Sequence, residues 1–153
     1  MMKSLNPILK IQSRKIGRDY PTYFIADIGA NHDGDLERAK ELIYLAAEAG
    51  ADAAKFQHFK AETIVSDLGF KTVGGQQSHQ AHWKKSVFEV YKDASVSLDW
   101  TATLKETCDK AGIAFFTSPY SIDIVEHMDP YVPAYKIGSG DITWIKMVEH
   151  IAS

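Results

Sequence analysis

The chain has 153 residues, of which 45% are hydrophobic and 11% aromatic. This length and composition suit one globular domain that builds its own core. The formal net charge is −3 and no basic run occurs, which argues against a nucleic-acid partner, because such a surface clusters Lys and Arg. Cys108 is the single cysteine and cannot form an internal disulfide, so a reducing compartment is expected.

Residues 1–22 are expected to form a polar lead-in with a short strand around residues 8–11. Pro7 and Lys10 interrupt the apolar residues before they reach the length of a signal peptide, and nothing downstream approaches a membrane span. The sequence therefore predicts a cytoplasmic protein without a membrane partner. Residues 23–153 form the predicted folded domain.

The first predicted strand covers residues 23–28, and a helix follows it. Asp35 suits the positive amino end of this helix, and Gly50 suits its C-cap. One face of the helix is apolar at helical spacing and consists of Leu36, Ala39, Leu42, Ile43 and Ala46. A second strand is predicted over residues 53–57, parallel to the first, because a helical crossover returns the chain in the same direction.

The pattern weakens between residues 60 and 97, where only a short helix over 86–92 is indicated. Trp83 in this excursion could either pack in the core or stack on a sugar. Beyond it, a helix is predicted over 98–111 with Asp99 as its cap. The remaining predicted elements are a strand at 113–118, a helix at 121–127, a strand at 134–137 and a helix at 142–152.

Four successive strand-helix units are typical of an α/β fold with a parallel sheet. We predict a partial (β/α)8 TIM barrel made of about four amino-terminal βα units. A complete barrel usually needs about 250 residues, so 153 residues are too few to close one. A fragment, a missing carboxyl half and the pairing of two halves are the alternatives that would account for an open sheet.

Polar side chains stand at the carboxyl ends of the predicted strands, where α/β folds bind their ligands. Lys55 and Lys136 lie in two otherwise apolar strands, and Ser118 and Ser139 lie near other strand ends. A buried ammonium needs an anion, so a structural ion pair is one interpretation of Lys55, with Asp27 as the candidate partner. The repeated arrangement favours a pocket for a small phosphate or carboxylate.

Two loops beyond the strands contain further candidates. Ser139 lies between Gly138 and Gly140, so the backbone there can approach an anion closely. Asn31 and His32 lie between a strand and a helix. His32 could carry a proton, contact a ligand or only form hydrogen bonds within its loop.

Four motifs follow one another along the chain: Ile25-Ala-Asp-Ile-Gly-Ala-Asn-His-Asp-Gly34, Gly50-Ala-Asp-Ala-Ala-Lys-Phe-Gln57, Phe116-Thr-Ser-Pro-Tyr120 and Pro133-Ala-Tyr-Lys-Ile-Gly-Ser-Gly-Asp141. In order and spacing they resemble the amino-terminal half of the N-acetylneuraminate (sialic acid) synthase family. The resemblance implies a barrel transferase that forms a carbon-carbon bond between phosphoenolpyruvate and an N-acylated aldose, such as N-acetylmannosamine. The implied products are a nine-carbon 2-keto sugar acid and phosphate.

The family resemblance also implies roles for individual residues. It implies catalytic roles for Asp27, Lys55, Lys136 and Asp141, and substrate contacts for Asn31, His32, Gln57, Thr117, Ser118 and Ser139. The lysines and serines would hold the phosphate and carboxylate of phosphoenolpyruvate, and Gln57 would lie near the sugar. Asp27 and Asp141 stand where the family usually has glutamate, so the acceptor could be a relative such as a legionaminic or pseudaminic acid precursor.

The resemblance further implies a divalent metal, Mn²⁺ or Mg²⁺, whose histidine ligands lie in the second half of the barrel. It implies a homodimer in which a carboxyl-terminal antifreeze-like domain reaches into the partner's site. Both parts lie outside this chain, so we predict that the chain alone is inactive. The alternatives are a related phosphoenolpyruvate-dependent aldulosonate synthase and a noncatalytic sugar-phosphate-binding or assembly module.

Overall fold

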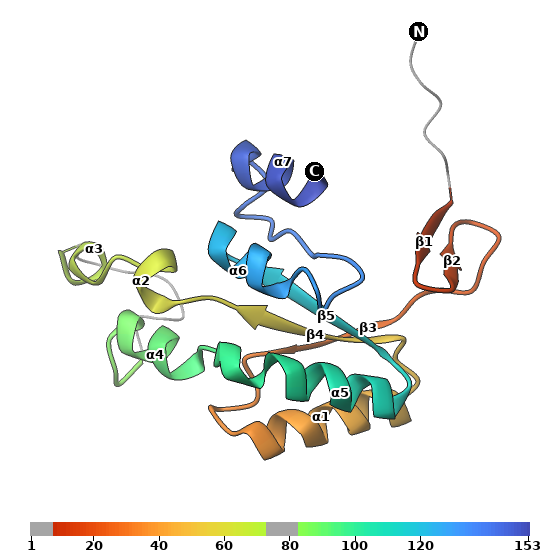
Figure 1. Cartoon of the computed structure of the whole chain (residues 1–153). Coiled ribbons are helices and arrows are strands. Elements are labelled where there is room, and N and C mark those ends of the chain that lie inside the picture. The colour runs from red at the N-terminus through yellow and green to blue at the C-terminus, as the bar shows by residue number, and fades with distance from the viewer. Residues whose placement is uncertain (1–7, 73–82) are drawn as a thin grey trace, which may run out of the picture.

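A parallel sheet of three strands lies at the centre of the computed structural model, which describes residues 8–72 and 83–153 (Figure 1). The strands are β3 (Ile25–Gly29), β4 (Ala53–His58) and β5 (Ala114–Pro119), and they lie side by side in this order. The three corresponding predicted strands are confirmed to within two residues at each end. Because the strands are parallel, their carboxyl ends meet at one edge of the sheet.

The two long helices, α1 (Leu36–Glu48) and α5 (Thr101–Ala111), lie side by side against one face of the sheet (Figure 1). Asp35, predicted to suit the positive amino end of this helix, is its N-cap, and its Oδ1 accepts hydrogen bonds from the backbone N–H groups of Glu37 (2.8 Å) and Arg38 (3.2 Å). The main core lies between these helices and the sheet. Its fully buried members include Ile43, Ala54, Phe56, Leu104 and Phe115.

The opposite face of the sheet is called the inner face, because it would line the interior of the predicted barrel. A smaller cluster of Ala53, Ala114 and Phe116 is buried there at the amino ends of the strands. A hairpin of β1 (Leu9–Ile11) and β2 (Arg14–Ile16) lies beside this end, where Arg14 Nη1 contacts Asp52 Oδ1 at 2.6 Å. The sequence predicted only the first of these two short strands.

The segment between β4 and α5 is more helical than predicted. It contains α2 (Ala61–Ile64), α3 (Asp67–Thr72) and the predicted short helix, now α4 (Val87–Ala94). A 3-10 turn at Leu98–Trp100 precedes α5, and Ser97, not Asp99, caps it through a bond from the Asp99 N–H to the Ser97 hydroxyl. The predicted Asp99 cap is therefore wrong, because Asp99 lies inside a turn that begins at Leu98, where its backbone N–H bonds to Ser97.

The predicted fourth strand at 134–137 is reduced to one parallel bridge between Tyr135 and Thr117. Its hydrogen bond runs from the Lys136 N–H to the Thr117 carbonyl (2.9 Å). Pro133 has no N–H to extend this ladder, and the described residues place no further strand on its other side. The chain thus follows the path of a fourth unit without a regular fourth strand.

Two helices complete the chain after β5: α6 (Ile122–Met128) and α7 (Ile145–Ala152), which pack against each other. Helix α7 starts three residues later than predicted, since residues 139–143 form turns. In the part of the chain that the structure describes, no helix has the length and apolar character needed to cross a membrane.

Candidate active site

An ion pair between neighbouring strands marks the carboxyl edge of the sheet. Asp27 of β3 and Lys55 of β4 are register partners, and Lys55 Nζ lies 2.7 Å from Asp27 Oδ1. The Lys55 residue is 7% exposed, whereas the Asp27 side chain is 63% exposed. A nearly buried ammonium requires such an anion, so the predicted partnership is confirmed.

Alternation along β4 puts Gln57 on the same face as Lys55. Gln57 is the register partner of Ser118 in β5, and its Nε2 donates a hydrogen bond to the Tyr120 hydroxyl (3.1 Å). The Ser118 hydroxyl is buried and has no hydrogen-bond partner among the described residues. A buried hydroxyl of this kind is costly in the free protein and is suited to meeting a ligand.

A bulge at the end of β3 brings the Asp27 and Gln57 side chains together. The register slips between Asp27 and Gly29, where Gly29 has φ +56°. A Cβ atom at Gly29 would lie 3.3 Å from Gln57 Oε1 and 3.4 Å from Asp27 Oδ1. Glycine therefore serves both the left-handed backbone and the close approach of two oxygen-bearing side chains.

The loop after residue 135 adds Lys136, Ser139 and Asp141. Tyr135 pairs with Thr117 and directs its hydroxyl to the Val125 carbonyl (2.9 Å) on the helix side, so alternation turns Lys136 to the inner face. Lys136 and Ser139 are exposed, and Asp141 is half-buried. The structure thus brings Asp27, Lys55, Gln57, Ser118 and the 136–141 loop to the carboxyl edge of the inner face.

Two predicted contacts lie elsewhere. The Thr117 hydroxyl is on the helix-covered face of β5, 2.8 Å from Nδ1 of the buried His58. His32 is also fully buried, with its ring against Trp100 and its Nδ1 accepting a hydrogen bond from the Gly34 N–H (3.0 Å). Strand alternation separates Thr117 from Ser118, and packing against Trp100 holds the His32 ring in the core.

Asn31 lies beside His32 in the same loop and is exposed. Its carbonyl accepts a hydrogen bond from Arg38 Nε (2.8 Å), which ties the loop to the first turn of α1. The predicted substrate contact of the Asn31 side chain stays a prediction.

Burial keeps the two histidines of the helix side neutral. Desolvation is the main cause that lowers the pKa of His58 to about 3, with smaller contributions from His127 and His32. Desolvation also lowers the pKa of His32, and nearby Asp33 opposes this. A group held neutral in the core is a poor proton carrier for a site on the other face, so the loop-residue interpretation of His32 agrees best with its surroundings.

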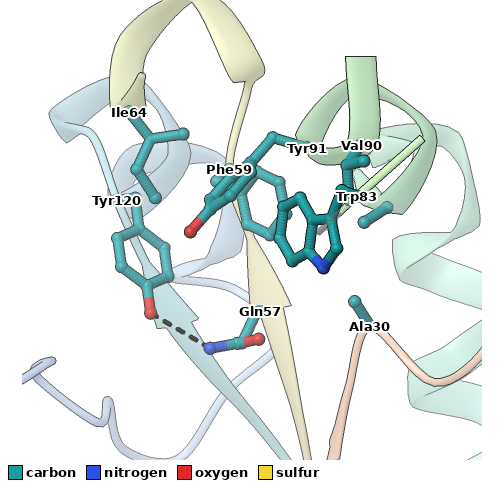
Figure 2. Close-up of a pocket in the computed structure, with 9 residues that line it drawn as sticks. Ala30, Gln57, Phe59, Ile64, Trp83, Val90, Tyr91 and Tyr120 are labelled. Atoms are coloured by element: carbon teal, nitrogen blue, oxygen red, sulfur yellow. Dashed lines mark hydrogen bonds between the residues drawn. The ribbon is translucent and has the colours of Figure 1, made fainter. Parts of the chain in front are cut away.

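A largely apolar pocket of about 290 Å³ opens next to Gln57 (Figure 2). It is lined by Ala30, Gln57, Phe59, Ile64, Trp83, Val90, Tyr91, Ala94 and Tyr120. The rings of Tyr91 and Tyr120 both pack against Phe59, with centroid distances of 5.5 Å and 6.0 Å. The sequence did not predict that Phe59, Tyr91 and Tyr120 line a pocket. Only Tyr120 could have been inferred, because it lies two residues after Ser118 and so faces the same side.

Burial and nearby charges raise the pKa of Tyr120 and keep its phenol neutral. Its pKa is raised, chiefly by desolvation and also by Asp141, Tyr91 and Asp27, while the hydrogen bond from Gln57 opposes this. The phenol therefore keeps its proton at neutral pH and remains a hydrogen-bond donor.

The implied metal needs donors that the described residues do not assemble on their own. Residues 8–72 and 83–153 contain no group of three or more His, Cys, Asp and Glu placed to hold a metal ion. Asp27 is already paired with Lys55, and the buried histidines face the helices. The residues present therefore do not fit a complete metal site.

Comparison with known protein families identifies the family of the chain. A model of the NeuB family matches residues 42–153, which is most of the chain. The chain belongs to the NeuB family. This membership confirms the resemblance to sialic acid synthases drawn from the four motifs.

Two relatives of this NeuB-family chain are synthases by name. The chain is 38% identical over 142 residues to N,N'-diacetyllegionaminic acid synthase of Legionella pneumophila, covering 90% of this chain and 38% of that protein. It is 34% identical over 140 residues to N-acetylneuraminate-9-phosphate synthase of Homo sapiens, covering 91% and 38%. The chain thus spans well under half the length of these relatives.

Solved structures show the same fold. A sialic acid synthetase of Leptospira borgpetersenii, crystallised with citrate, superposes with a TM-score of 0.76 at 30% identity over 95% of this chain and 46% of that one. A truncated 3-deoxy-D-arabino-heptulosonate 7-phosphate synthase of Thermotoga maritima superposes at 0.60 with 14% identity over 94% and 40%, which supports the fold alone. The neighbours are TIM-barrel-like synthases, and this chain corresponds to part of such a barrel.

Proposed function

We propose that the protein contributes to the condensation of phosphoenolpyruvate with an N-acylated aldose, giving a nine-carbon 2-keto sugar acid and phosphate. The observation that carries this proposal is the Lys55–Asp27 pair beside the unpartnered, buried Ser118 hydroxyl. A cation and a free hydroxyl at the carboxyl edge of a parallel sheet suit a small phosphate or carboxylate. The named synthases among the relatives support the same chemistry.

The chemistry divides into two bond-forming steps and one bond-breaking step. The enolpyruvate carbon attacks the sugar aldehyde and forms the new carbon-carbon bond, leaving an oxocarbenium-like centre. Water adds to this centre and gives up a proton, and the alkoxide formed from the aldehyde takes up a proton. The tetrahedral intermediate then breaks its carbon-oxygen bond to phosphate as its hydroxyl loses a proton and becomes the 2-keto group, and phosphate leaves with that proton. Lys55, Lys136, Ser118 and Ser139 are proposed to hold the phosphate and carboxylate, and the lysines stabilise the charge on the departing phosphate.

The two carboxylates are proposed to orient the reacting groups or exchange a proton. Asp27 holds Lys55 in place through its 2.7 Å contact. Asp141 lies close enough to Tyr120 to raise its pKa, and both side chains lie next to Gly138. An aspartate reaches one methylene less far than the glutamate usual in the family, so substrates must sit closer to the sheet here.

Metal, assembly and location also enter as proposals. We propose that turnover depends on Mn²⁺ or Mg²⁺, that the active protein is a homodimer and that it works in the cytoplasm. The described residues provide no complete metal site, so none of the roles above depends on the metal. Removal of the metal by a chelator, followed by re-addition of Mn²⁺ or Mg²⁺, tests the first proposal.

A second candidate function is a noncatalytic sugar-phosphate-binding or assembly module. The exposed Lys136 and Ser139 favour it, because within the described structure these two side chains are open to water. The replacement of glutamate by Asp27 and Asp141 points the same way. An aldulosonate synthase is the other enzyme candidate, and its acceptor would be a sugar without an acylamido group.

Phosphate release distinguishes these candidates. The protein is expressed from its gene up to the natural stop codon. It is then incubated with phosphoenolpyruvate, Mn²⁺ and a panel of N-acylated and unmodified aldoses. Release that requires an N-acylated aldose supports the proposal, and release with unmodified sugar phosphates favours the aldulosonate reaction. Binding of phosphoenolpyruvate without release from any sugar favours the noncatalytic module.

A further inference from the structure

Lys136 lies in a segment that few bonds hold to the sheet. Residues 134–137 pair with β5 through one parallel bridge, between Tyr135 and Thr117, and through the Lys136 N–H, which donates to the Thr117 carbonyl (2.9 Å). Within residues 8–72 and 83–153, no strand lies on the other side of this segment. A slip of one residue would turn Lys136 away from the inner face, because side chains of an extended chain alternate between faces. One bridge is a weak constraint, so the register of Lys136 depends on further contacts.

Tyr135 supplies such contacts on the helix side of the sheet. Its ring is partly buried and packs against the main core. Its hydroxyl donates a hydrogen bond to the Val125 carbonyl of α6 (2.9 Å) and lies 3.4 Å from Asp129 Oδ1. The Val125 carbonyl also accepts the Asp129 N–H (3.0 Å) at the end of that helix. Tyr135 thus connects the segment to α6, which packs against β5 (Figure 1).

The chemistry of the phenol suits a permanent anchor. Burial raises the pKa of Tyr135, and the nearby Asp129 carboxylate adds to this effect. The hydroxyl therefore keeps its proton at neutral pH and can donate to Val125. Its acceptor is a backbone carbonyl in a helix, which does not titrate and cannot rotate away as a side chain can.

We infer that Tyr135 is a positioning residue for Lys136: its hydroxyl, held on α6, sets the register that directs the Lys136 ammonium to the inner face. Lys136 is exposed, so packing does not fix its side chain, and its backbone decides which region the ammonium can reach. Tyr135 lies on the helix side and would not touch the substrate. The inference rests on the proposed function, which gives Lys136 a contact with the phosphate or carboxylate of phosphoenolpyruvate.

Phosphoenolpyruvate binding tests the inference in the protein expressed from its gene up to the natural stop codon. Tyr135→Phe keeps the ring and removes only the hydroxyl, and it leaves the Val125 carbonyl its bond from Asp129. In calorimetric titration this variant is expected to bind phosphoenolpyruvate about fivefold more weakly, the size of effect of one neutral hydrogen bond. Tyr131→Phe is the matched control and should keep the affinity, because Tyr131 packs on the same core and stacks on His127 (6.0 Å).

A double-mutant cycle separates positioning from a general disturbance of the fold. Lys136→Ala removes the ammonium and is expected to weaken binding by itself; if it does so while Tyr135→Phe does not, the inference is overturned. In the Lys136→Ala background, Tyr135→Phe should weaken binding by less than about twofold, because the group that it positions is absent. Equal losses in the two backgrounds would show that the hydroxyl does not act through Lys136, which would also overturn the inference.

Hydrogen exchange separates this inference from the proposed function, because it needs no substrate. The amide followed is the N–H that Lys136 donates to Thr117, measured by mass spectrometry in a peptide covering residues 133–138. Tyr135→Phe should speed this exchange about fivefold or more, whereas Tyr131→Phe should leave it unchanged. Faster exchange with full phosphoenolpyruvate affinity in both Tyr135→Phe and Lys136→Ala would retain the anchor and refute the proposed role of Lys136. Unchanged exchange in Tyr135→Phe would overturn the inference, whatever the affinity.

Discussion

Ser118 and Thr117 are neighbours on β5, and their hydroxyl groups lie on opposite faces of the sheet. The Thr117 hydroxyl bonds to His58 in the core, and the Ser118 hydroxyl is buried on the inner face without a partner among the described residues. Removing a bonded hydroxyl leaves its partner unsatisfied, which costs about 1–3 kcal/mol. Removing an unpartnered hydroxyl relieves a desolvation cost that the free protein already bears.

We therefore predict that Thr117→Val lowers the free energy of unfolding by about 1–3 kcal/mol. Ser118→Ala is expected to keep or raise that free energy and to weaken phosphoenolpyruvate binding by about tenfold, the loss of one hydrogen bond to a charged ligand. Urea denaturation and calorimetric titration measure the two quantities. Weaker binding in Thr117→Val with intact binding in Ser118→Ala would reverse the assignment of the two faces.

His58 makes stability depend on pH. Burial lowers its pKa from 6.5 to about 3. Between pH about 3 and 6.5, His58 is therefore protonated in the unfolded chain and neutral in the folded chain. The stabilisation is fully present above pH about 6.5 and is lost as the pH falls toward about 3, with a slope of up to about 1.4 kcal/mol per pH unit.

His58→Gln removes this titration and keeps a polar partner for Thr117, so the free energy of unfolding should fall less steeply with acid. His150→Gln, on a half-exposed histidine of α7, is the control and should leave the slope as it is. His32, also buried, accounts for part of the slope that remains. Parallel pH profiles for the parent chain and His58→Gln would contradict the prediction.

At the scale of elements, the loop 136–141 depends on one crowded glycine. A Cβ atom at Gly138 would lie 2.5 Å from Asp141 Oδ2, whereas one at Gly140 would meet nothing within 4 Å. Neither Gly138 nor Gly140 has a left-handed backbone, since positive φ occurs among the described glycines only at Gly29, Gly34, Gly50 and Gly112. Space, not conformation, is what requires glycine at residue 138.

We predict that Gly138→Ala displaces the Asp141 carboxylate and lowers kcat/KM for phosphate release by about tenfold or more, as misplacement of a catalytic group does. Gly140→Ala, a matched substitution in the same loop, should have a much smaller effect. The assay uses the polypeptide read to its stop codon. Equal losses in the two variants would point to a general disturbance of the loop.

Elements were predictable where local signals and tertiary packing agree. The strand cores of β3, β4 and β5 and the helix α1, with its Asp35 cap, follow from periodicity and capping. A regular strand at 134–137 was predicted but did not form. A β-ladder needs hydrogen-bond partners on the neighbouring strand, and Pro133 has no backbone N–H to donate. Strand β2 was missed because three residues are too short for a periodic signal.

At the scale of the molecule, the described sheet has an open inner face. Large apolar side chains are exposed along it and around it, including Phe24 at 62%, Ile25 at 42% and Ile142 at 67%. A complete barrel would cover the inner face and exclude water, which strengthens the attraction between cations and a bound phosphate. The site in this chain has the residues of one wall only.

We therefore predict that the purified 153-residue chain alone releases no phosphate from phosphoenolpyruvate and an N-acylated aldose, even with Mn²⁺ present. The physical reason is that exposed Lys136 and Ser139 are screened by water. A circular dichroism spectrum checks that the chain is folded, and a sensitive phosphate assay follows turnover. Measurable turnover by this chain would contradict the prediction.

The sequence by itself determined the strand-helix order, the family and the Asp27–Lys55 partnership, because these depend on periodicity, motif spacing and the need of a buried lysine for an anion. Only the tertiary structure decided on which face of the sheet each side chain lies. It turned Thr117 and His32 toward the core and joined Phe59, Tyr91 and Tyr120 in one pocket. Those placements depend on sheet register and on contacts between residues far apart in the chain, which local patterns do not encode.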